Sequence, residues 1–264
     1  MQWTVGFLGC GNMGQALLGG WLSNLQLSPE QVVITSKSTS AKTAKRFGVR
    51  SVDVDTLVSV SDVIILAVKP QYAAEVVEPL SFKEEQLVIS IMAGTPIHRL
   101  GVAPARVIRT MPNVGSRIGK GATVAFAGPG VSSVEKDRVG ALFDSLGCLE
   151  WLEDEDQFHA GTALVGSGPA YIFMALEAMA DAALEAGLPA SSVRRLAAAT
   201  VEGAAKLALE SNEDPAVLKQ RVASPGGTTV AALSRLEHHG FSEALKDAMN
   251  AASKRSRELA TGET

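Results

Sequence analysis

Cysteine is nearly absent from this sequence: only Cys10 and Cys148 occur, in a spacing that fits neither a disulfide framework nor a zinc site. Charged residues make up 20% of the chain and the net charge is -4, so the basic excess of a nucleic-acid-binding protein is missing. No uninterrupted apolar run reaches about 18 residues, and the N-terminus lacks the basic segment of a secretory signal. We therefore expect a cytoplasmic protein with reduced thiols and with no metal, nucleic-acid or membrane partner.

In the first part of the chain, β-rich runs alternate with helical stretches such as 40–47, 71–80 and 133–145. Continuous apolar runs, for example Val63 to Val68, are typical of strands covered on both faces of a parallel sheet. The other strand-like runs lie at 3–8, 32–35, 87–92, 106–111, 122–127 and 148–152. The alternation predicts an α/β fold, with an N-terminal Rossmann-type, doubly wound sheet of about eight strands over residues 1–156.

The acidic residues Glu153, Asp154, Glu155 and Asp156 form a run that we expect to be a solvated linker, and beyond it the composition changes. Alanine and leucine dominate and β-branched runs disappear, which predicts a second, all-helical domain over residues 157–264. Its first helix should be interrupted by GSGP at 166–169. Further helices are expected up to Gly187 and at 190–210, 214–222, 228–238 and 241–259. The many small residues suit either a monomeric bundle or a dimer interface.

A glycine pattern carries the strongest chemical signal. In GFLGCGNMG at 6–14, Gly9, Gly11 and Gly14 form G-x-G-x-x-G between a predicted strand and a predicted helix. In that position the first glycine permits a tight turn, the second lets the backbone approach a pyrophosphate, and the third allows close packing of helix against strand. The pattern predicts dinucleotide binding; the alternative is a glycine-rich turn without a ligand.

The end of the second predicted strand indicates which dinucleotide binds. An NAD site usually has an acidic side chain here, which accepts hydrogen bonds from the ribose 2′-hydroxyl. This chain instead has Ser36, Lys37 and Ser38, whose hydroxyl and ammonium groups can hold a 2′-phosphate. We expect NADP(H), with NAD(H) as the alternative, and Lys37 could also be an ordinary surface charge. Lys69, which follows another buried strand, could face either the cofactor or solvent.

Acid–base side chains are scarce in both predicted domains. The four histidines stand in no Ser/His/Asp, Cys/His or metal-ligand pattern, and we expect structural roles for them: His98, His159, His238 and His239. No lysine occurs between Phe158 and Gly187, on the long helix where hydroxy-acid dehydrogenases of related layout carry one. A protonated C=N carbon accepts hydride without a separate strong acid, so the missing base favours reduction of an imine.

A second glycine-rich corner is SPGGTT at 224–229, directly before the helical run VAALSRLE. Two glycines expose backbone N–H groups and two threonines add hydroxyls at a helix start, which is an arrangement that binds anions. The other interpretation is an ordinary N-cap, in which Thr228 or Thr229 satisfies the first N–H groups of the helix. Both interpretations hold together if the N–H groups around Gly226 and Gly227 stay free.

Six motifs, in this order and approximate spacing, resemble the pyrroline-5-carboxylate reductase family: FLGCGNMGQAL, AVKPQ, SIMAGTPI, RTMPN, GSGPAYIF and SPGGTTVAAL. The resemblance covers nearly the whole chain and is most specific from Pro215 to Glu237. It implies NADPH- or NADH-dependent reduction of L-1-pyrroline-5-carboxylate to L-proline, the last step of proline synthesis. The alternatives are a reductase of a related cyclic imino acid and a 3-hydroxy acid dehydrogenase-like enzyme. The resemblance also implies a homodimer, in some members assembled into larger rings, whose sites combine groups of different chains.

Carried over by position, the resemblance assigns two groups of residues to the site. The first group binds the cofactor, with the initial turn around the pyrophosphate, Ser36 and Lys37 at the adenosine ribose and Asn113 near the nicotinamide: Leu8, Gly9, Cys10, Gly11, Asn12, Met13, Ser36, Lys37, Ala67, Val68, Lys69, Pro70, Ala93, Gly94 and Asn113. The second group holds the substrate carboxylate through its backbone: Ser224, Gly226, Gly227, Thr228 and Thr229. Thr229 is the implied catalytic contact, to the ring nitrogen.

The sequence departs from the family's usual pattern at a few positions. Val114-Gly115 stands where Thr-Pro is common, Val165 where serine is usual, and Arg221 where several members carry asparagine. Val165 removes a potential hydrogen-bonding group, and Arg221 could alter contacts with the cofactor. These changes bear on fine specificity more than on the reaction class.

Overall fold

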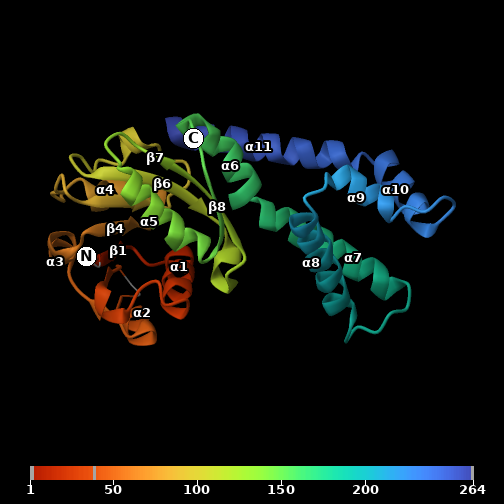
Figure 1. Cartoon of the computed structure of the whole chain (residues 1–264), viewed down its shortest axis with the longest axis horizontal. Coiled ribbons are helices and arrows are strands. Elements are labelled where there is room, and N and C mark those ends of the chain that lie inside the picture. Colours follow the sequence, from red (N-terminus) through yellow and green to blue (C-terminus); the bar gives the residue numbers. More distant parts are fainter. Residues whose placement is uncertain (1–2, 38–39, 263–264) are drawn as a thin grey trace. The chain divides into compact units, whose positions relative to one another are not determined.

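The computed structural model describes residues 3–37 and 40–262, and Figure 1 shows the arrangement of their helices and strands. The chain forms two compact units, one made of Met1–Ser167 with Asn250–Thr264 and the other of Gly168–Met249. The first unit contains the sheet, whereas the second is helical. This confirms the predicted fold class, an α/β part followed by a helical part.

An eight-stranded sheet, with the order β3-β2-β1-β4-β5-β6-β7-β8, runs through the described part of the first unit. Neighbouring strands are parallel except for β6 and β7, which are antiparallel. The strands are β1 (Val5–Leu8), β2 (Val32–Thr35), β3 (Arg50–Ser51), β4 (Val63–Leu66), β5 (Leu87–Ser90), β6 (Arg106–Pro112), β7 (Gly121–Ala127) and β8 (Gly147–Trp151). The strand order changes direction at β1, between β2 and β4, which is where ligands bind in doubly wound sheets.

Helices cover both faces of this sheet: α1 (Asn12–Ser23), α2 (Ser40–Phe47), α3 (Val54–Val60), α4 (Ala73–Val77) and α5 (Ser133–Asp144). On one face, Trp21 of α1 and Phe143 of α5 pack with Phe7 of β1 in a single buried cluster, and the Trp21 indole N–H donates to the Leu142 carbonyl at 2.8 Å. On the other face, α3 and α4 contribute a second buried cluster with β2, β4 and β5. Strands buried on both sides explain the continuous apolar runs of the sequence.

Two predicted elements differ from the observed ones. The strand β3 was not expected, because its two residues are exposed at the sheet edge and lack an apolar run. The helix expected over 71–80 is a 3-10 turn at Pro70–Tyr72 followed by the short α4. Pro79 follows the C-cap residue Glu78 and has no backbone N–H with which to continue the helical hydrogen bonds.

The division between the units differs from the predicted boundary at 156/157. The short helix α6 (Phe158–Gly161) and the π-helical turn Thr162–Gly166 belong with the sheet, because Phe158 and Val165 are buried in a cluster with strand residues. The last turns of α11 (Phe241–Thr261) also belong there: the Ser256 hydroxyl lies 2.9 Å from Nδ1 of His159 on α6. The packing division thus follows side-chain burial and not the change of composition.

The second unit contains α7 (Gly168–Glu185), α8 (Val193–Ser211), α9 (Pro215–Arg221), α10 (Thr228–His238) and the first residues of α11. Helix α7 ends near Gly187, as predicted from the glycine and Pro189. The expected interruption near 166–169 takes the form of the π-helical turn just before it, where the Ser167 N–H donates to the Thr162 carbonyl at 2.9 Å. Pro169 would clash with the carbonyl four residues earlier in a regular helix, and a wider turn avoids that clash.

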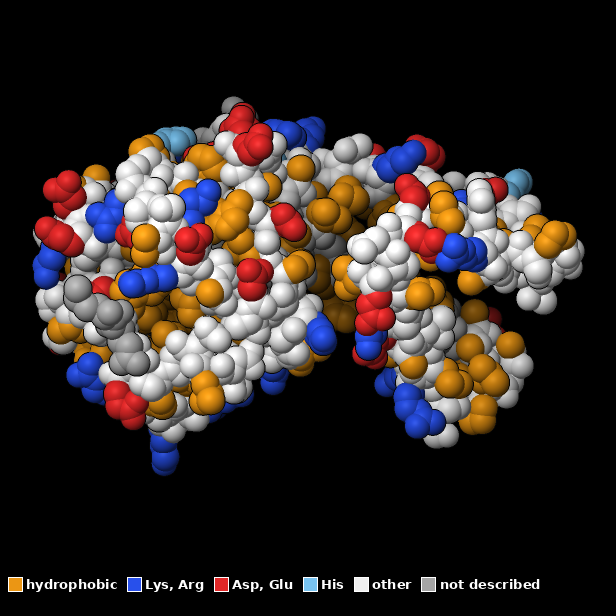
Figure 2. Space-filling view, in the orientation of Figure 1, with side chains coloured by type: hydrophobic (Ala, Val, Ile, Leu, Met, Phe, Trp, Pro, Cys, Tyr) orange, Lys and Arg blue, Asp and Glu red, His pale blue; other side chains and the backbone are white. Residues whose placement is uncertain are grey.

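Much of the second unit's surface is apolar. Phe173 and Met174 of α7 are 61% and 74% exposed, and Figure 2 shows apolar side chains gathered over this unit. By length and composition alone, Glu155–Glu185 is the one span of the described chain that could cross a membrane. Exposed apolar surface on this scale is typical of protein–protein or membrane interaction sites.

Candidate cofactor and substrate site

The residues predicted to bind the cofactor lie together at one edge of the sheet. They follow or end five neighbouring strands that are all parallel, so their carboxyl ends share this edge. Leu8 is the last residue of β1, and the others come after a strand. In sheet order they follow β2 (Ser36, Lys37), β1 (Gly9, Cys10, Gly11, Asn12, Met13), β4 (Ala67, Val68, Lys69, Pro70), β5 (Ala93, Gly94) and β6 (Asn113). The predicted substrate residues, 224–229, belong to the helical unit.

Gly9 fixes the turn between β1 and α1. Its N–H donates to the Thr35 carbonyl at 2.9 Å, and its φ is +83°. A Cβ at this position would lie 2.8 Å from the carbonyl carbon and oxygen of Ala67, at the end of β4. Only glycine allows this approach, which brings the turn against the neighbouring strand end.

Gly11 is the N-cap of α1, and within the described chain no side chain caps that helix start. A Cβ on Gly11 would meet no protein atom within 4 Å. The protein's own packing therefore does not require glycine here, and the open space in front of the first N–H groups of α1 fits a pyrophosphate. The residues at the start of α1 therefore fit a dinucleotide, because the pyrophosphate would lie where any side chain on residue 11 would obstruct it.

The third glycine of the pattern has a different role from the one expected. A Cβ on Gly14 would make ordinary contacts at 3.5–3.6 Å with Ala67 and Cys10. The tight contact of α1 lies further along, at Gly20, where a Cβ would come within 2.4 Å of the Leu146 side chain. Close helix packing in this chain therefore depends on Gly20 more than on Gly14.

Cys10 contributes to the turn through its backbone. Its side chain is 1% exposed, and burial raises the pKa of the thiol to about 12. The thiol therefore stays neutral at physiological pH, and the Cys10 carbonyl accepts a hydrogen bond from the Gln15 amide at 3.1 Å. These contacts give Cys10 a packing role and exclude thiolate chemistry.

Two lysines flank the pyrophosphate turn. Lys37 follows β2 and Lys69 follows β4, the two strands on either side of β1, and both side chains are exposed. No acidic residue directly follows β2 in the sequence, so the charge of Lys37 is available to an anion. This edge of the sheet therefore suits phosphate groups on both sides of the turn.

The side chain of Asn113 is held in one orientation at the end of β6. Its Oδ1 accepts hydrogen bonds from the N–H groups of Gly115 at 3.0 Å and Ala122 at 3.3 Å. With the oxygen engaged, the amide NH2 group is the part that a ligand can use. Proline, which is common at this position in the family, has no N–H and would remove one of the two donors. Glycine at position 115 therefore supports the orientation of Asn113.

The structure contains a buried ion pair that the sequence did not predict. Arg109 of β6 is 1% exposed; its Nη1 lies 2.9 Å from Oε1 of Glu155, and its guanidinium lies 4.3 Å from the centre of the Phe158 ring. Burial lowers the pKa of Arg109, and the Glu155 carboxylate opposes that shift. Glu155 Oε1 also accepts a hydrogen bond from the Ile97 N–H at 2.8 Å.

The expectation of a solvated linker is therefore wrong for Glu155. Its carboxylate neutralises a charge inside the sheet, because an unpaired buried arginine would be costly. The available signal was Arg109 itself, a charged residue in the middle of the apolar run RVIRTM.

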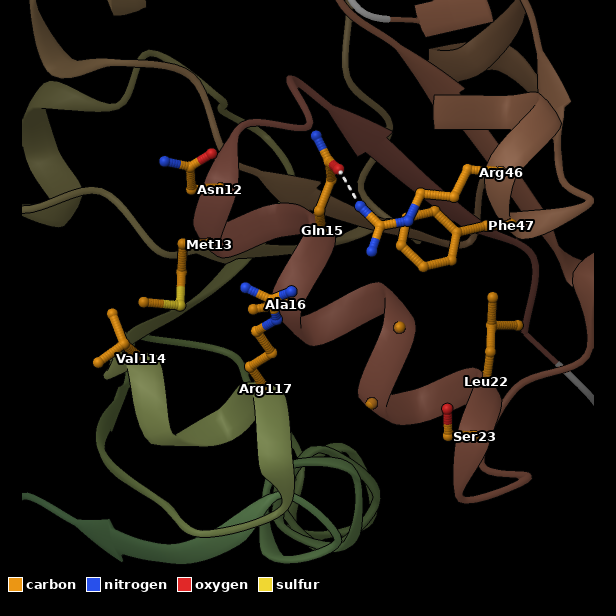
Figure 3. A pocket seen from close by; sticks show the side chains of 12 residues that line it. Asn12, Met13, Gln15, Ala16, Leu22, Ser23, Arg46, Phe47, Val114 and Arg117 are labelled. Carbon is orange, nitrogen blue, oxygen red and sulfur yellow. Dashed lines mark hydrogen bonds between the residues drawn. The ribbon is translucent and has the colours of Figure 1, made fainter. Parts of the chain in front are cut away.

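A groove of about 870 Å³ runs along α1 beside the turn (Figure 3). It shares Asn12 and Met13 with the predicted cofactor residues, and the rest of its lining comes from later turns of α1, from α2 and from the 3-10 turn Val114–Ile118. Arg46 reaches across it to Gln15, with Nη1 3.3 Å from Oε1. The glycines of the turn, Gly9 and Gly11, and both lysines lie at the strand ends and do not line this groove.

The SPGGTT corner begins α10 in an unexpected way. The helix starts at Thr228 with Gly227 as its N-cap, and no side chain caps it within the described residues. The interpretation in which Thr228 or Thr229 caps the helix is therefore wrong: both threonines lie inside the first turn, past the N-cap position.

The backbone before α10 forms a tight turn. Pro225 and Gly226, with φ +71°, occupy its centre, and the Gly227 N–H donates to the Ser224 carbonyl at 2.9 Å. The N–H of Gly227 is thus engaged and not free as expected. The N–H groups of Thr228, Thr229 and Val230 precede the first helical bond, from Ala231 to Gly227, and they are the groups that an anion can meet.

Two other departures have partners within their own units. The Val165 side chain is buried with Met111 and Phe158, so this position serves packing. The Arg221 guanidinium forms a two-point ion pair with Glu213, at 2.5 and 2.6 Å, which engages the charge within the helical unit.

The fold and the strand-end site together define an NAD(P)-binding oxidoreductase with a helical dimerisation domain. Residues 155–259 match the family described as pyrroline-5-carboxylate reductase dimerisation, and residues 4–94 match NADP oxidoreductase, coenzyme F420-dependent. The pyrroline-5-carboxylate reductase of Pseudomonas aeruginosa is 39% identical over 97% of this chain and 96% of its own. This chain therefore belongs to the pyrroline-5-carboxylate reductase family.

Solved structures agree with this membership over both units. A pyrroline-5-carboxylate reductase from Coxiella burnetii has a TM-score of 0.89 at 34% identity and covers 98% of this chain and 99% of its own. A pyrroline carboxylate reductase from Plasmodium falciparum with NADP bound also has a TM-score of 0.89, at 28% identity and 98% of both chains.

Substitution of Gly11 should separate cofactor binding from folding. Gly11→Ala is expected to fold, with at most a small fall in melting temperature, because the added methyl meets no protein atom and the only cost is alanine in place of glycine at the N-cap. It should weaken NADP(H) binding by about tenfold or more, because the methyl pushes the pyrophosphate away from about one charge-assisted hydrogen bond. Fluorescence titration with NADPH checks this, with Gly14→Ala as the matched control whose methyl points into ordinary contacts. Equal affinity in wild type and Gly11→Ala would contradict the assignment.

Proposed function

We propose that this protein catalyses the NAD(P)H-dependent reduction of L-1-pyrroline-5-carboxylate to L-proline, the final step of proline biosynthesis. The observation that carries the proposal is the family membership over nearly the whole chain. Two uncapped helix starts support it, α1 for the dinucleotide and α10 for the substrate carboxylate. When bound, the nicotinamide cofactor supplies the hydride for the C=N carbon.

The cofactor residues have distinct tasks in this proposal. The N–H groups at the start of α1 hold the pyrophosphate, and Gly11 leaves room for it. Ser36 and Lys37 hold the adenosine ribose and its 2′-phosphate. Asn113, with its oxygen engaged, presents its NH2 group on the nicotinamide side of the edge.

The substrate is oriented by α10. In this proposal the first N–H groups of the helix hold the carboxylate, and the hydroxyl of Thr229, in the first turn of α10, contacts the ring nitrogen. His159 is unsuited to proton transfer, because its Nδ1 lies against Ser256, and burial, aided by the charges of Arg257 and Arg109, lowers its pKa. Catalysis then depends on positioning and on fixed backbone dipoles.

Thr229→Ala tests the substrate assignment. Loss of one buried polar contact, about 1–3 kcal/mol, should lower kcat/KM for pyrroline-5-carboxylate by about 5- to 150-fold. Thr229→Ser should retain most of the activity, because it keeps the hydroxyl. Thr228→Ala keeps its backbone N–H and serves as the matched control. An unchanged kcat/KM would remove Thr229 from the mechanism. The same assay with piperideine- and thiazoline-carboxylates identifies the preferred ring, and turnover of hydroxy acids alone would contradict the proposed reaction.

We also propose that NADPH is preferred over NADH. The serine and lysine after β2, and the lack of a carboxylate there, support this choice. Lys37→Ala should lower kcat/KM with NADPH by about fivefold, the range for an exposed charge pair, and leave the value with NADH unchanged. Lys42→Ala, an exposed lysine on α2, is the control. The ratio of the two cofactors is the decisive measurement, and a constant ratio would dismiss the phosphate contact.

We propose that the active form is a homodimer in which the helical units cover one another's apolar surface. The exposed side chains of α7 and the family description of residues 155–259 support this proposal. A second copy of the same apolar surface buries these side chains without a membrane. In this assembly the cofactor edge of one chain is completed by the substrate corner of its partner.

Mixing two defective variants tests this arrangement. Neither Gly11→Ala nor Thr229→Ala should support full activity alone. After subunit exchange, each mixed dimer should contain one site with both native groups, and about a quarter of wild-type activity should return at limiting NADPH. Sites built within single chains would each keep one defect, so a mixture no more active than its components would contradict the shared site. Sedimentation equilibrium of both variants confirms that dimers are compared.

A further inference from the structure

The loop that joins β5 to β6 rests on the end of the chain. Gly94, with φ +66°, is buried, and a Cβ on it would lie 2.7 Å from Cβ of Leu259 in the last turns of α11. Arg99, the last residue of the 3-10 turn Ile97–Arg99 in the same loop, donates a hydrogen bond through Nη1 to the Ala260 carbonyl. Its Nη2 also lies 3.2 Å from the position that a Cβ on Gly262 would take. The segment Leu259–Gly262 therefore contacts the loop at two places.

This segment is itself anchored to the sheet-bearing unit. Nδ1 of His159 lies 2.9 Å from the Ser256 hydroxyl, one turn before Leu259, and both side chains are buried. A separate contact holds the middle of the loop, where the Ile97 N–H donates to Glu155. The loop is thus fixed from the side of α11 and from the buried Arg109–Glu155 pair.

We propose that Leu259–Gly262 is a positioning element, which holds the β5–β6 loop in the conformation that binds the cofactor. The proposal rests on the assignment of Ala93 and Gly94 to the cofactor edge. Ala93 is exposed at that edge while Gly94 packs against Leu259, so one side of the loop faces the ligand and the other rests on α11. Without this contact a glycine loop gains conformational freedom, and a smaller fraction of molecules is competent to bind.

The continuity of α11 gives this contact a wider meaning. Its residues up to Met249 belong to the helical unit and those from Asn250 belong to the sheet-bearing unit. One unbroken helix therefore begins in the dimerisation unit and ends on the cofactor loop. Changes that shift the end of α11 should act on cofactor affinity, and they should do so without altering any group that touches the substrate.

Leu259→Ala and Arg99→Ala test the proposal in the full-length protein. Arg99→Ala removes the hydrogen bond to the Ala260 carbonyl, and Leu259→Ala removes the side chain beyond Cβ, including Cδ1, which lies 3.5 Å from the position of a Cβ on Gly94. Lys254→Ala, an exposed lysine on the same helix, is the matched control. The dissociation constant for NADPH is measured by fluorescence without imine, and hydrogen exchange of the amides of residues 91–100 is measured without cofactor. We expect the dissociation constant to rise about tenfold in Leu259→Ala, as it does when the competent fraction falls to a tenth. Exchange in the loop should accelerate, while kcat at saturating NADPH stays unchanged.

The outcomes separate this role from the proposed function. Wild-type affinity and exchange in both variants would overturn the positioning role and leave the proposed reaction intact. A wild-type protein that binds neither NADPH nor NADH would contradict the cofactor assignment itself. If Leu259→Ala does not fold, Arg99→Ala and Leu259→Met decide, because the first removes only an exposed side chain and the second keeps the apolar contact. An NADPH affinity of Leu259→Met close to that of the wild type supports the positioning role. A variant that loses kcat while its NADPH affinity is unchanged contradicts that role.

Discussion

The close approach of the β1–α1 turn to the end of β4 is the constraint on which this site depends. At Gly9 the backbone of the turn lies so near the Ala67 carbonyl that no side chain fits between them. This contact fixes the direction in which α1 leaves the sheet and leaves its first N–H groups open at the carboxyl edge. Lys37 and Lys69 then border the same opening because β2 and β4 flank β1. An anion site thus follows from one backbone contact at the switch point of the sheet.

Local patterns predicted most of the fold. Apolar runs located the long strands because a parallel sheet buries both faces of each strand, and glycine and proline marked the ends of α7. The glycine pattern predicted the tight turn between β1 and α1, but it could not show that Gly20 and not Gly14 makes the tight helix contact, since Leu146 approaches from far along the chain. At SPGGTT the prediction that α10 starts at Thr228 was correct, but the predicted threonine cap was wrong. The turn through Pro225 and Gly226 makes Gly227 the N-cap instead, although threonine is a common N-cap residue.

Contacts between distant residues were beyond the reach of the sequence. Glu155 looked like one member of an acidic linker, because its partner Arg109 is brought near only by the packing of the junction on the sheet. The contacts of Gly94 with Leu259 and of His159 with Ser256 also join segments more than ninety residues apart. Such pairs have no local periodicity or spacing. In our proposal these contacts position the β5–β6 loop beside the other predicted cofactor residues.

The chemical character of the site follows from the kind of groups it uses. The groups proposed to bind anions are backbone N–H donors at two helix starts, and these do not titrate. Cys10 stays neutral because burial raises its pKa, and His159 is held neutral because burial and nearby arginines lower its pKa. A substrate that required a general acid would find no suitable group in these residues. An imine carries the proton that activates it on its own nitrogen, so the proposed combination of fixed dipoles and the Thr229 hydroxyl needs no general acid for its reduction.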